Sequence, residues 1–118
     1  KNKLKKKILI LGITYKKNSD DVRESPILQI HDYLNKKIRN KIHVCDPLIN
    51  KQSLKKMKKI KFISLAKLKN KRYIKNFDLC FVGTNHNIFN YNYIANNFKI
   101  IFDSRHSFKR YKKNIKII

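Results

Sequence analysis

The side chains best suited to bind a ligand are a few cations that follow predicted strands. Lys16 and Arg23 lie in the loop 12–24, after a short apolar run, and Arg105 follows a later apolar run. The first loop leads into a helix that begins at Ser25-Pro26, so these cations lie near a helix N-terminus. This arrangement suits a phosphate or a pyrophosphate. Lysine is abundant in the chain and arginine is scarce, so Arg23 and Arg105 carry more weight than Lys16.

The same loop differs from the rest of the chain, because it holds three of the seven acidic residues. Asp20 and Asp21 would fix Arg23 or cap backbone N–H groups, although a plain Asx turn explains them equally well. His86 could act as a base, but a lone histidine in a loop is more often structural. We take the polar side chains of these loops as supporting residues of the predicted site: Asp20, Asp21, Glu24, Ser25, His86 and Asp103.

Several kinds of site are not expected in this chain. A dinucleotide fingerprint needs a glycine-rich first turn, but the only glycines here are Gly12 and Gly83, so the domain should not hold a whole NAD by itself. Cys45 and Cys80 lie inside predicted strands and are expected to be reduced, buried and unreactive. We predict no metal site and no catalytic residue.

Strands that alternate with helices predict an α/β fold: a three-layer, Rossmann-like parallel sheet of about five strands with helices on both faces. The expected strands cover about residues 7–11, 41–45, 62–63, 79–83 and 99–102. The expected helices cover about 26–38, 53–58, 65–73 and 91–97, with Asn40 ending the first. All the notable loops follow strands, so they should meet at one edge of the sheet and form one composite site.

The chain of 118 residues is expected to form a single domain, 1–118. Its core should span about 7–106, preceded by a frayed lead-in, 1–6, and followed by a basic tail, 107–118. The last isoleucines of that tail could pack on the sheet. Because the sequence begins at Lys1 without a methionine, we expect a piece of a longer chain or a processed product.

A formal net charge of +23 is the most unusual property of the composition. Such a charge attracts nucleic acid or an anionic membrane. However, the lysines are spread over the whole chain together with many Asn and Ile residues, which favours drift of base composition over selected nucleic-acid binding. There is no apolar run long enough for a transmembrane helix or a signal peptide, so the cytoplasm is the expected location.

Four motifs make the sequence recognisable: GITYKKNSDDVRESPIL, HVCDPLI, TNHNIFNY and IIFDSRH. In order and spacing they resemble the C-terminal UDP-sugar-binding domain of the UDP-glucose/GDP-mannose dehydrogenase family, over about residues 7–106. They look most like the UDP-N-acetylglucosamine 6-dehydrogenase branch, which serves surface-polysaccharide synthesis. Two positions depart from the family pattern: Lys17 stands where many members have Pro, and Asn85 stands where Asp is common.

The resemblance implies an NAD-dependent oxidation of a nucleotide sugar's 6-hydroxyl to a carboxylate through a cysteine-bound intermediate. The family's NAD-binding domain, and its central domain that carries the catalytic cysteine and forms the homo-oligomer, have no counterpart here. By the same resemblance, Tyr15, Lys16 and Arg105 would contact the UDP-sugar, and Arg23 would reach NAD across a domain interface. The chain alone is therefore predicted to be inactive.

Two other interpretations remain open. The chain could be a stand-alone basic module that binds RNA or acidic polymers. It could also be a decayed domain that folds but has no activity.

Overall fold

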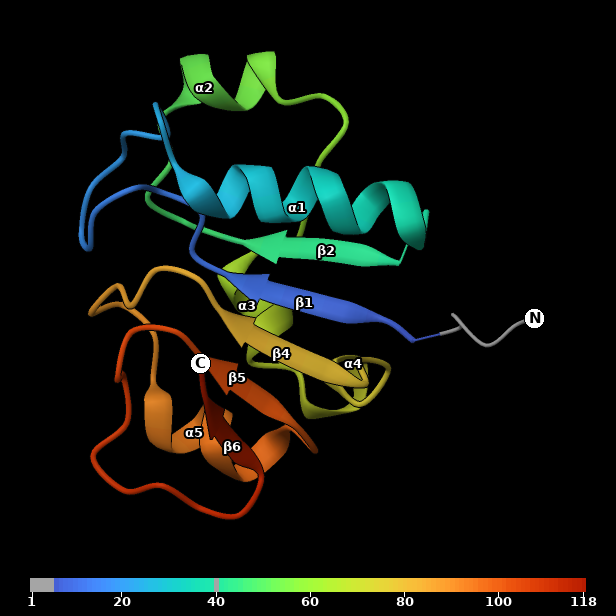
Figure 1. Cartoon of the computed structure of the whole chain (residues 1–118), viewed down its shortest axis with the longest axis vertical. Helices are drawn as coiled ribbons and strands as arrows, with labels where there is room; N and C mark the ends of the chain where they lie inside the picture. Colours follow the sequence, from blue (N-terminus) through green and yellow to red (C-terminus); the bar gives the residue numbers. More distant parts are fainter. Residues whose placement is uncertain (1–5, 40) are drawn as a thin grey trace.

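The computed structural model describes residues 6–39 and 41–118, so Asn40 and residues 1–5 of the predicted lead-in lie outside the described residues. Its centre is one sheet of six parallel strands in the order β3-β2-β1-β4-β5-β6 (Figure 1). The strands are β1 (Ile8–Leu11), β2 (Ile42–Cys45), β3 (Lys61–Phe62), β4 (Leu79–Val82), β5 (Ile101–Asp103) and β6 (Ile115–Ile117). The predicted α/β class and parallel sheet are confirmed.

Strand β1 lies in the middle of the sheet, and all four of its residues are buried. Leu9 and Leu11 belong to one hydrophobic cluster, and Ile8 and Ile10 belong to another. Successive side chains of a strand point to opposite faces, so this alternation shows that both faces of the sheet are covered. Burial on both faces explains why the sequence is apolar without interruption from Ile8 to Leu11.

The helices divide between the two faces as the direction of the chain requires. From β1 the chain moves outward to β2 and β3, with α1 (Pro26–Lys37) and α2 (Lys51–Lys56) on one face. It then crosses back to β4 and moves on to β5, with α3 (Leu65–Leu68), α4 (Lys71–Ile74) and α5 (Tyr91–Asn97) on the other face (Figure 1). Right-handed crossovers that run in opposite directions must lie on opposite faces, which produces the three layers.

The expectation of about five strands was one too few, and the predicted tail 107–118 lies within the fold. Strand β6 pairs in parallel with β5, and Phe108 and Ile115 are buried in the core. The Asn114 side chain donates to the carbonyl oxygens of Ala95 and Phe98, which ties the returning chain to the end of α5. A three-residue strand reached by a connection without a helix leaves too short a periodic pattern to recognise in a lysine-rich sequence.

The predicted helix 65–73 was also wrong, because two short helices occupy this stretch. The chain leaves the helical path at Asn70, whose backbone is extended and whose side chain accepts from the Tyr73 N–H at the start of α4. An asparagine side chain competes with the helix for backbone N–H groups, and here the cap prevails.

No helix in the described residues is long and apolar enough to cross a membrane.

The two glycines of the sequence mark the closest approach of two chain segments, at the carboxyl ends of β1 and β4. Gly12 has a φ of 79°, and a Cβ there would lie 2.3 Å from the Thr84 carbonyl oxygen. A Cβ on Gly83 would lie 2.6 Å from the Gly12 carbonyl oxygen and 2.7 Å from Ile27 Cγ2. Any larger residue would push these loops apart, so the glycines set the spacing on which the site is built.

Candidate functional site

A buried carboxylate at the end of β2 joins the loops that follow β1, β2 and β4. Asp46 Oδ2 accepts from the Ile13 N–H at 2.8 Å and lies 3.0 Å from His86 Nε2. Its other oxygen, Oδ1, accepts from the Leu48 N–H at 3.1 Å. Three partners compensate the cost of burying this carboxylate. Asp46 therefore fastens three strand-end loops to one another.

His86 is fully buried, and its hydrogen bonds define its protonation. The Asn18 N–H donates to His86 Nδ1 at 2.8 Å, so Nδ1 carries no proton. The ring proton must then be on Nε2, where it points to Asp46 Oδ2. With both ring nitrogens engaged inside the protein, His86 is not available as a general base, and of the two roles considered from the sequence the geometry supports the structural one.

Three exposed residues, Tyr15, Lys16 and Lys17, lie between the buried Thr14 and the anchored Asn18. On one side, Thr14 is buried and its carbonyl oxygen accepts from the Thr84 hydroxyl at 2.6 Å. On the other side, Asn18 has a φ of 59°, and its Oδ1 accepts from the Asn87 N–H in addition to the bond from its own N–H to the histidine. The backbone of residues 14–18 is therefore fixed at both ends, while its central side chains face solvent.

The structure brings Arg105 to this loop from the other side of β4. Arg105 Nη2 donates to the Tyr15 carbonyl oxygen at 3.2 Å, across 90 positions of sequence. The Tyr15 side chain is 50% exposed, and Lys16 is exposed beside it. The three residues expected to contact the nucleotide sugar thus lie on two adjoining loops at the carboxyl edge of the sheet. This is the edge where open α/β sheets bind ligands.

Asp103 shapes the turn that presents Arg105. Its carboxylate is buried and accepts from the N–H groups of Arg105 and Ser107 and from the hydroxyls of Ser107 and Tyr111. Burial by itself would raise the pKa of Asp103, but the hydrogen bonds from Tyr111, Ser107 and Arg105 outweigh it, and the pKa is lowered. The carboxylate therefore stays charged at neutral pH and acts as the centre of the turn.

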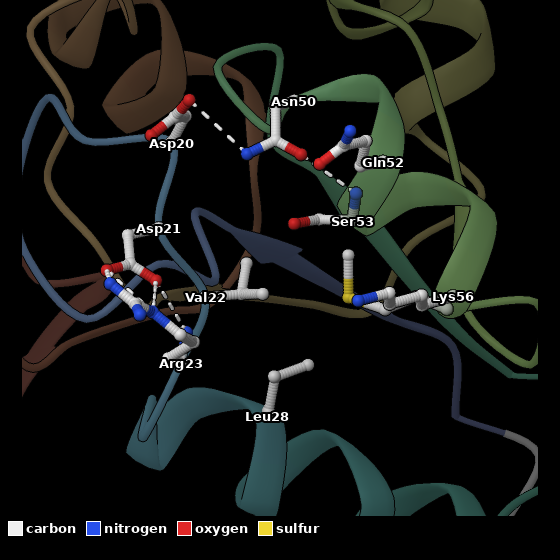
Figure 2. Close-up of a pocket in the computed structure, with 10 residues that line it drawn as sticks. Asp20, Asp21, Val22, Arg23, Leu28, Asn50, Gln52, Ser53 and Lys56 are labelled. Atoms are coloured by element: carbon white, nitrogen blue, oxygen red, sulfur yellow. Dashed lines mark hydrogen bonds and ion pairs between the residues drawn. The ribbon is translucent and has the colours of Figure 1, made fainter.

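Arg23 lies in a different part of the edge, where it pairs with Asp21. The Asp21 carboxylate accepts from Arg23 Nε at 3.0 Å and from Nη2 at 2.9 Å, and these bonds lower the pKa of Asp21 to about 2. The Arg23 side chain is 86% exposed. Asp20 accepts instead from the Asn50 side chain at 3.3 Å (Figure 2). The bidentate geometry holds the guanidinium at the surface.

A pocket of about 390 Å³ opens between this arginine and α2 (Figure 2). Asp20, Asp21 and Arg23 form one wall, and residues of the loop after β2 and of α2 form the other. Tyr15, Lys16 and Arg105 do not line it. The predicted cations therefore do not form one cluster, because Arg105 contacts the loop that carries Lys16, whereas Arg23 lies at the pocket.

The remaining predicted residues of the first loop have structural positions. Ser25 is buried, caps α1 by accepting from the Ile27 N–H, and donates to the Ile13 carbonyl oxygen at 2.6 Å. Glu24 is exposed and has a φ of 56° at the turn into the helix. These two residues shape the entry to α1.

The first turn does not fit the pyrophosphate of a dinucleotide. In such folds a ligand approaches the bare backbone of a glycine-rich turn, but the space above Gly12 is filled by the backbone and Cβ of Thr84, 2.3–2.9 Å from where a Cβ would be.

Burial raises the pKa of the Cys45 thiol to about 12 and that of Cys80 well above its usual range. Both thiols are free and buried, so neither can serve as a nucleophile.

Sequence reasoning missed the residues that hold the site together. Asp46, Thr14 and Thr84 were not selected, although each directly follows or closely follows a buried strand. A polar residue that is buried beside a strand end must have partners. The available signal was Asp46 itself, a carboxylate that directly follows the apolar end of β2.

Comparison with known proteins links this geometry to a family. A model of the UDP binding domain of the UDP-glucose/GDP-mannose dehydrogenase family matches residues 9–110. A search of curated proteins finds no match to the chain.

Solved structures share the fold. The chain is similar to the UDP-N-acetyl-mannosamine dehydrogenase Cap5O from Staphylococcus aureus, with 20% identity over 95% of this chain, 25% of that chain and a TM-score of 0.64. A UDP-D-ManNAc dehydrogenase from Pyrococcus horikoshii has 24% identity over 95% of this chain and 24% of that chain, with a TM-score of 0.61. A GDP-mannose dehydrogenase from Pseudomonas aeruginosa has 18% identity over 95% of this chain and 28% of that chain, with a TM-score of 0.73.

The chain thus spans about a quarter of the length of each of these proteins. The family match covers residues 9–110, and the likeness in fold covers 95% of the chain. The resemblance found in the four sequence motifs is confirmed at the level of the family. The chain belongs to the UDP-glucose/GDP-mannose dehydrogenase family and corresponds to its UDP binding domain.

Proposed function

We propose that this chain is the UDP-sugar-binding part of an NAD-dependent nucleotide-sugar 6-dehydrogenase. The observation that carries the proposal is the contact of Arg105 with the Tyr15 backbone within a domain of this family. It gathers two cations and an exposed aromatic ring at the ligand-binding edge of the sheet. The substrate is UDP-N-acetylglucosamine or a related UDP-hexose, and its oxidation product serves surface-polysaccharide synthesis.

The side chains at this edge have complementary tasks toward such a ligand. Lys16 and Arg105 neutralise the diphosphate, the arginine by paired N–H donors and the lysine as a point charge. Tyr15 offers an exposed ring beside them for the uracil or sugar. Because its carbonyl oxygen also orients the guanidinium, the aromatic and cationic contacts are set by one loop.

The redox chemistry takes place on polypeptide outside this chain. NAD, when bound, accepts the hydride. The first turn of this chain does not fit a dinucleotide, so NAD is held mainly by a separate NAD-binding domain. Arg23, exposed at the rim, reaches toward it across the domain interface. A central domain supplies the catalytic cysteine and the homo-oligomer contact, and the assembled enzyme works in the cytoplasm. Alone, this chain binds substrate and forms no NADH.

Calorimetric titration of the chain with UDP and with UDP-N-acetylglucosamine tests the proposal. We expect binding, and about a tenfold or greater loss of affinity in Arg105→Ala and Lys16→Ala, since each charge-assisted contact is worth about 1.5–3 kcal/mol. Arg72→Ala is the matched control, because Arg72 is exposed on α4, on a different part of the fold's surface from this loop pair, and the variant should bind like the unchanged chain. Equal affinity in all variants, or no binding at all, would contradict the proposal.

The net charge of +23 favours one competing function, the binding of RNA or acidic polymers. An unrelated RNA titrated over a salt series separates the two. Electrostatic RNA binding falls steeply with salt and is insensitive to any single cation, whereas UDP-sugar binding requires Lys16 and Arg105. Tight RNA binding at physiological salt without UDP binding would support the competing function.

A further inference from the structure

We propose that His86 and Asp46 are positioning residues that hold the loop of Tyr15 and Lys16 in its substrate-binding conformation. This inference rests on the proposed function, because the loop's task is taken from it. The two residues come from the ends of different strands and are both buried. Neither side chain is exposed to solvent, so they act through the backbone they hold.

His86 and Asp46 hydrogen-bond to the loop of Tyr15 and Lys16 at both of its ends. At the start, the Ile13 N–H donates to Asp46 Oδ2 at 2.8 Å. At the far end, the Asn18 N–H donates to His86 Nδ1 at 2.8 Å. The contact between His86 Nε2 and Asp46 Oδ2, 3.0 Å long, closes the chain of bonds. One continuous path of hydrogen bonds thus spans the exposed residues Tyr15 and Lys16.

The middle of the loop is supported from inside by the same ring. Thr14 Oγ1 donates to the Lys16 carbonyl oxygen at 2.8 Å and lies 3.4 Å from His86 Nε2, where it is a weaker second acceptor for the proton that points to Asp46. The backbone that carries Lys16 is thereby connected to the buried pair through one hydroxyl. A shift of the imidazole would therefore move the backbone of Lys16 and, with it, the position of the Lys16 ammonium group.

The arrangement also requires one tautomer of the histidine. The Asn18 N–H can donate only to an unprotonated Nδ1, and Asp46 needs a donor at Nε2, so a neutral ring protonated at Nε2 satisfies both. An apolar ring of similar size would fill the space but leave a buried carboxylate oxygen and the loop's N–H without this partner. His86 therefore connects the Asn18 N–H, a donor, with the Asp46 carboxylate, an acceptor.

The experiment compares three variants of the whole chain. His86→Phe removes both bonds, and His86→Gln restores an oxygen that can accept from the Asn18 N–H and an amide that can donate to Asp46. His31→Phe is the matched control, because His31 is equally buried on α1 and, among the described residues, hydrogen-bonds only with its neighbour Asp32. UDP affinity, amide exchange of residues 14–18 and the ring ¹⁵N shifts are measured.

In His86→Phe we expect UDP affinity to fall about five- to tenfold and the Asn18 amide to exchange faster, with recovery in His86→Gln and no effect in His31→Phe. Ring ¹⁵N shifts of the unchanged chain should show a proton on Nε2 alone. A proton on Nδ1 would overturn the proposal even if His86→Phe does not fold. It would also be overturned if His86→Phe lost stability but kept the affinity and exchange of the control.

The two proposals fail in different ways. If the unchanged chain binds no UDP, the proposed function is wrong. Exchange of the loop amides then still decides whether His86 holds the loop, because this measurement needs no ligand.

Discussion

Replacing Asp103 with asparagine tests how the turn that presents Arg105 is stabilised. One carboxylate oxygen accepts from the Arg105 N–H and the Ser107 hydroxyl, and the other accepts from the Ser107 N–H and the Tyr111 hydroxyl. The variant turns one of these oxygens into an NH₂ group, which cannot accept. In either orientation one backbone N–H, that of Arg105 or that of Ser107, loses its acceptor, whereas the hydroxyl beside it can rotate and accept from the new NH₂ group.

The magnitude follows from that one lost acceptor. A buried polar group left without a partner costs about 1–3 kcal/mol, so we expect Asp103→Asn to lower the free energy of unfolding by about 1–3 kcal/mol. That is a substantial part of the roughly 5–15 kcal/mol typical of a domain. With a urea dependence of about 1–3 kcal/mol per M, the unfolding midpoint should fall by about 1 M.

The pH dependence of the free energy of unfolding is a second test of the role of the Asp103 carboxylate. The pKa of Asp103 is lowered in the folded chain, so its contribution is present at neutral pH and is lost as the pH falls below the ordinary value of 3.8. The difference in stability between the unchanged chain and Asp103→Asn should therefore shrink on acidification through that range.

Urea unfolding followed by circular dichroism, at neutral pH and in an acid series, measures both effects. Asp32→Asn is the control, because the Asp32 side chain is 70% exposed on α1 and loses the same charge. Equal midpoints for Asp103→Asn and the control at neutral pH would refute the reasoning, and so would a stability difference that stays constant as the pH falls.

Two further predictions concern the glycines and the cysteines. Gly83→Ala places a methyl 2.6 Å from the Gly12 carbonyl oxygen and 2.7 Å from Ile27 Cγ2, so unfolding should become easier by about 1–3 kcal/mol, measured in urea. An unchanged midpoint would show that the strand ends are free to separate. Cys45 and Cys80 are buried, and their thiol pKa values are raised, so iodoacetamide at pH 8 should modify them only in urea. Rapid labelling of the native chain, read by mass spectrometry, would show that these strands open.

The strong local signals of the sequence were sufficient for most of the fold. The buried strand 8–11 and the Ser25-Pro26 start of α1 could be predicted because each depends on residues adjacent in the chain. The break at Asn70 and the strand β6 could not. The break is a local competition between the helix and the cap that Asn70 makes with the Tyr73 N–H, and the apolar pattern does not decide it. Strand β6 forms only because the folded chain brings it beside β5.

The candidate site divides in the same way. The sequence by itself determined that scarce arginines and a polar loop follow strands, and that parallel strands place such loops at one edge. Only the tertiary structure decided that Arg105 meets Tyr15, while Arg23 pairs with Asp21 at a separate pocket. It also decided that His86 is a buried connector to Asp46. The physical reason is that side-chain partners depend on distances and burial across the sheet, which residue types and spacing do not encode.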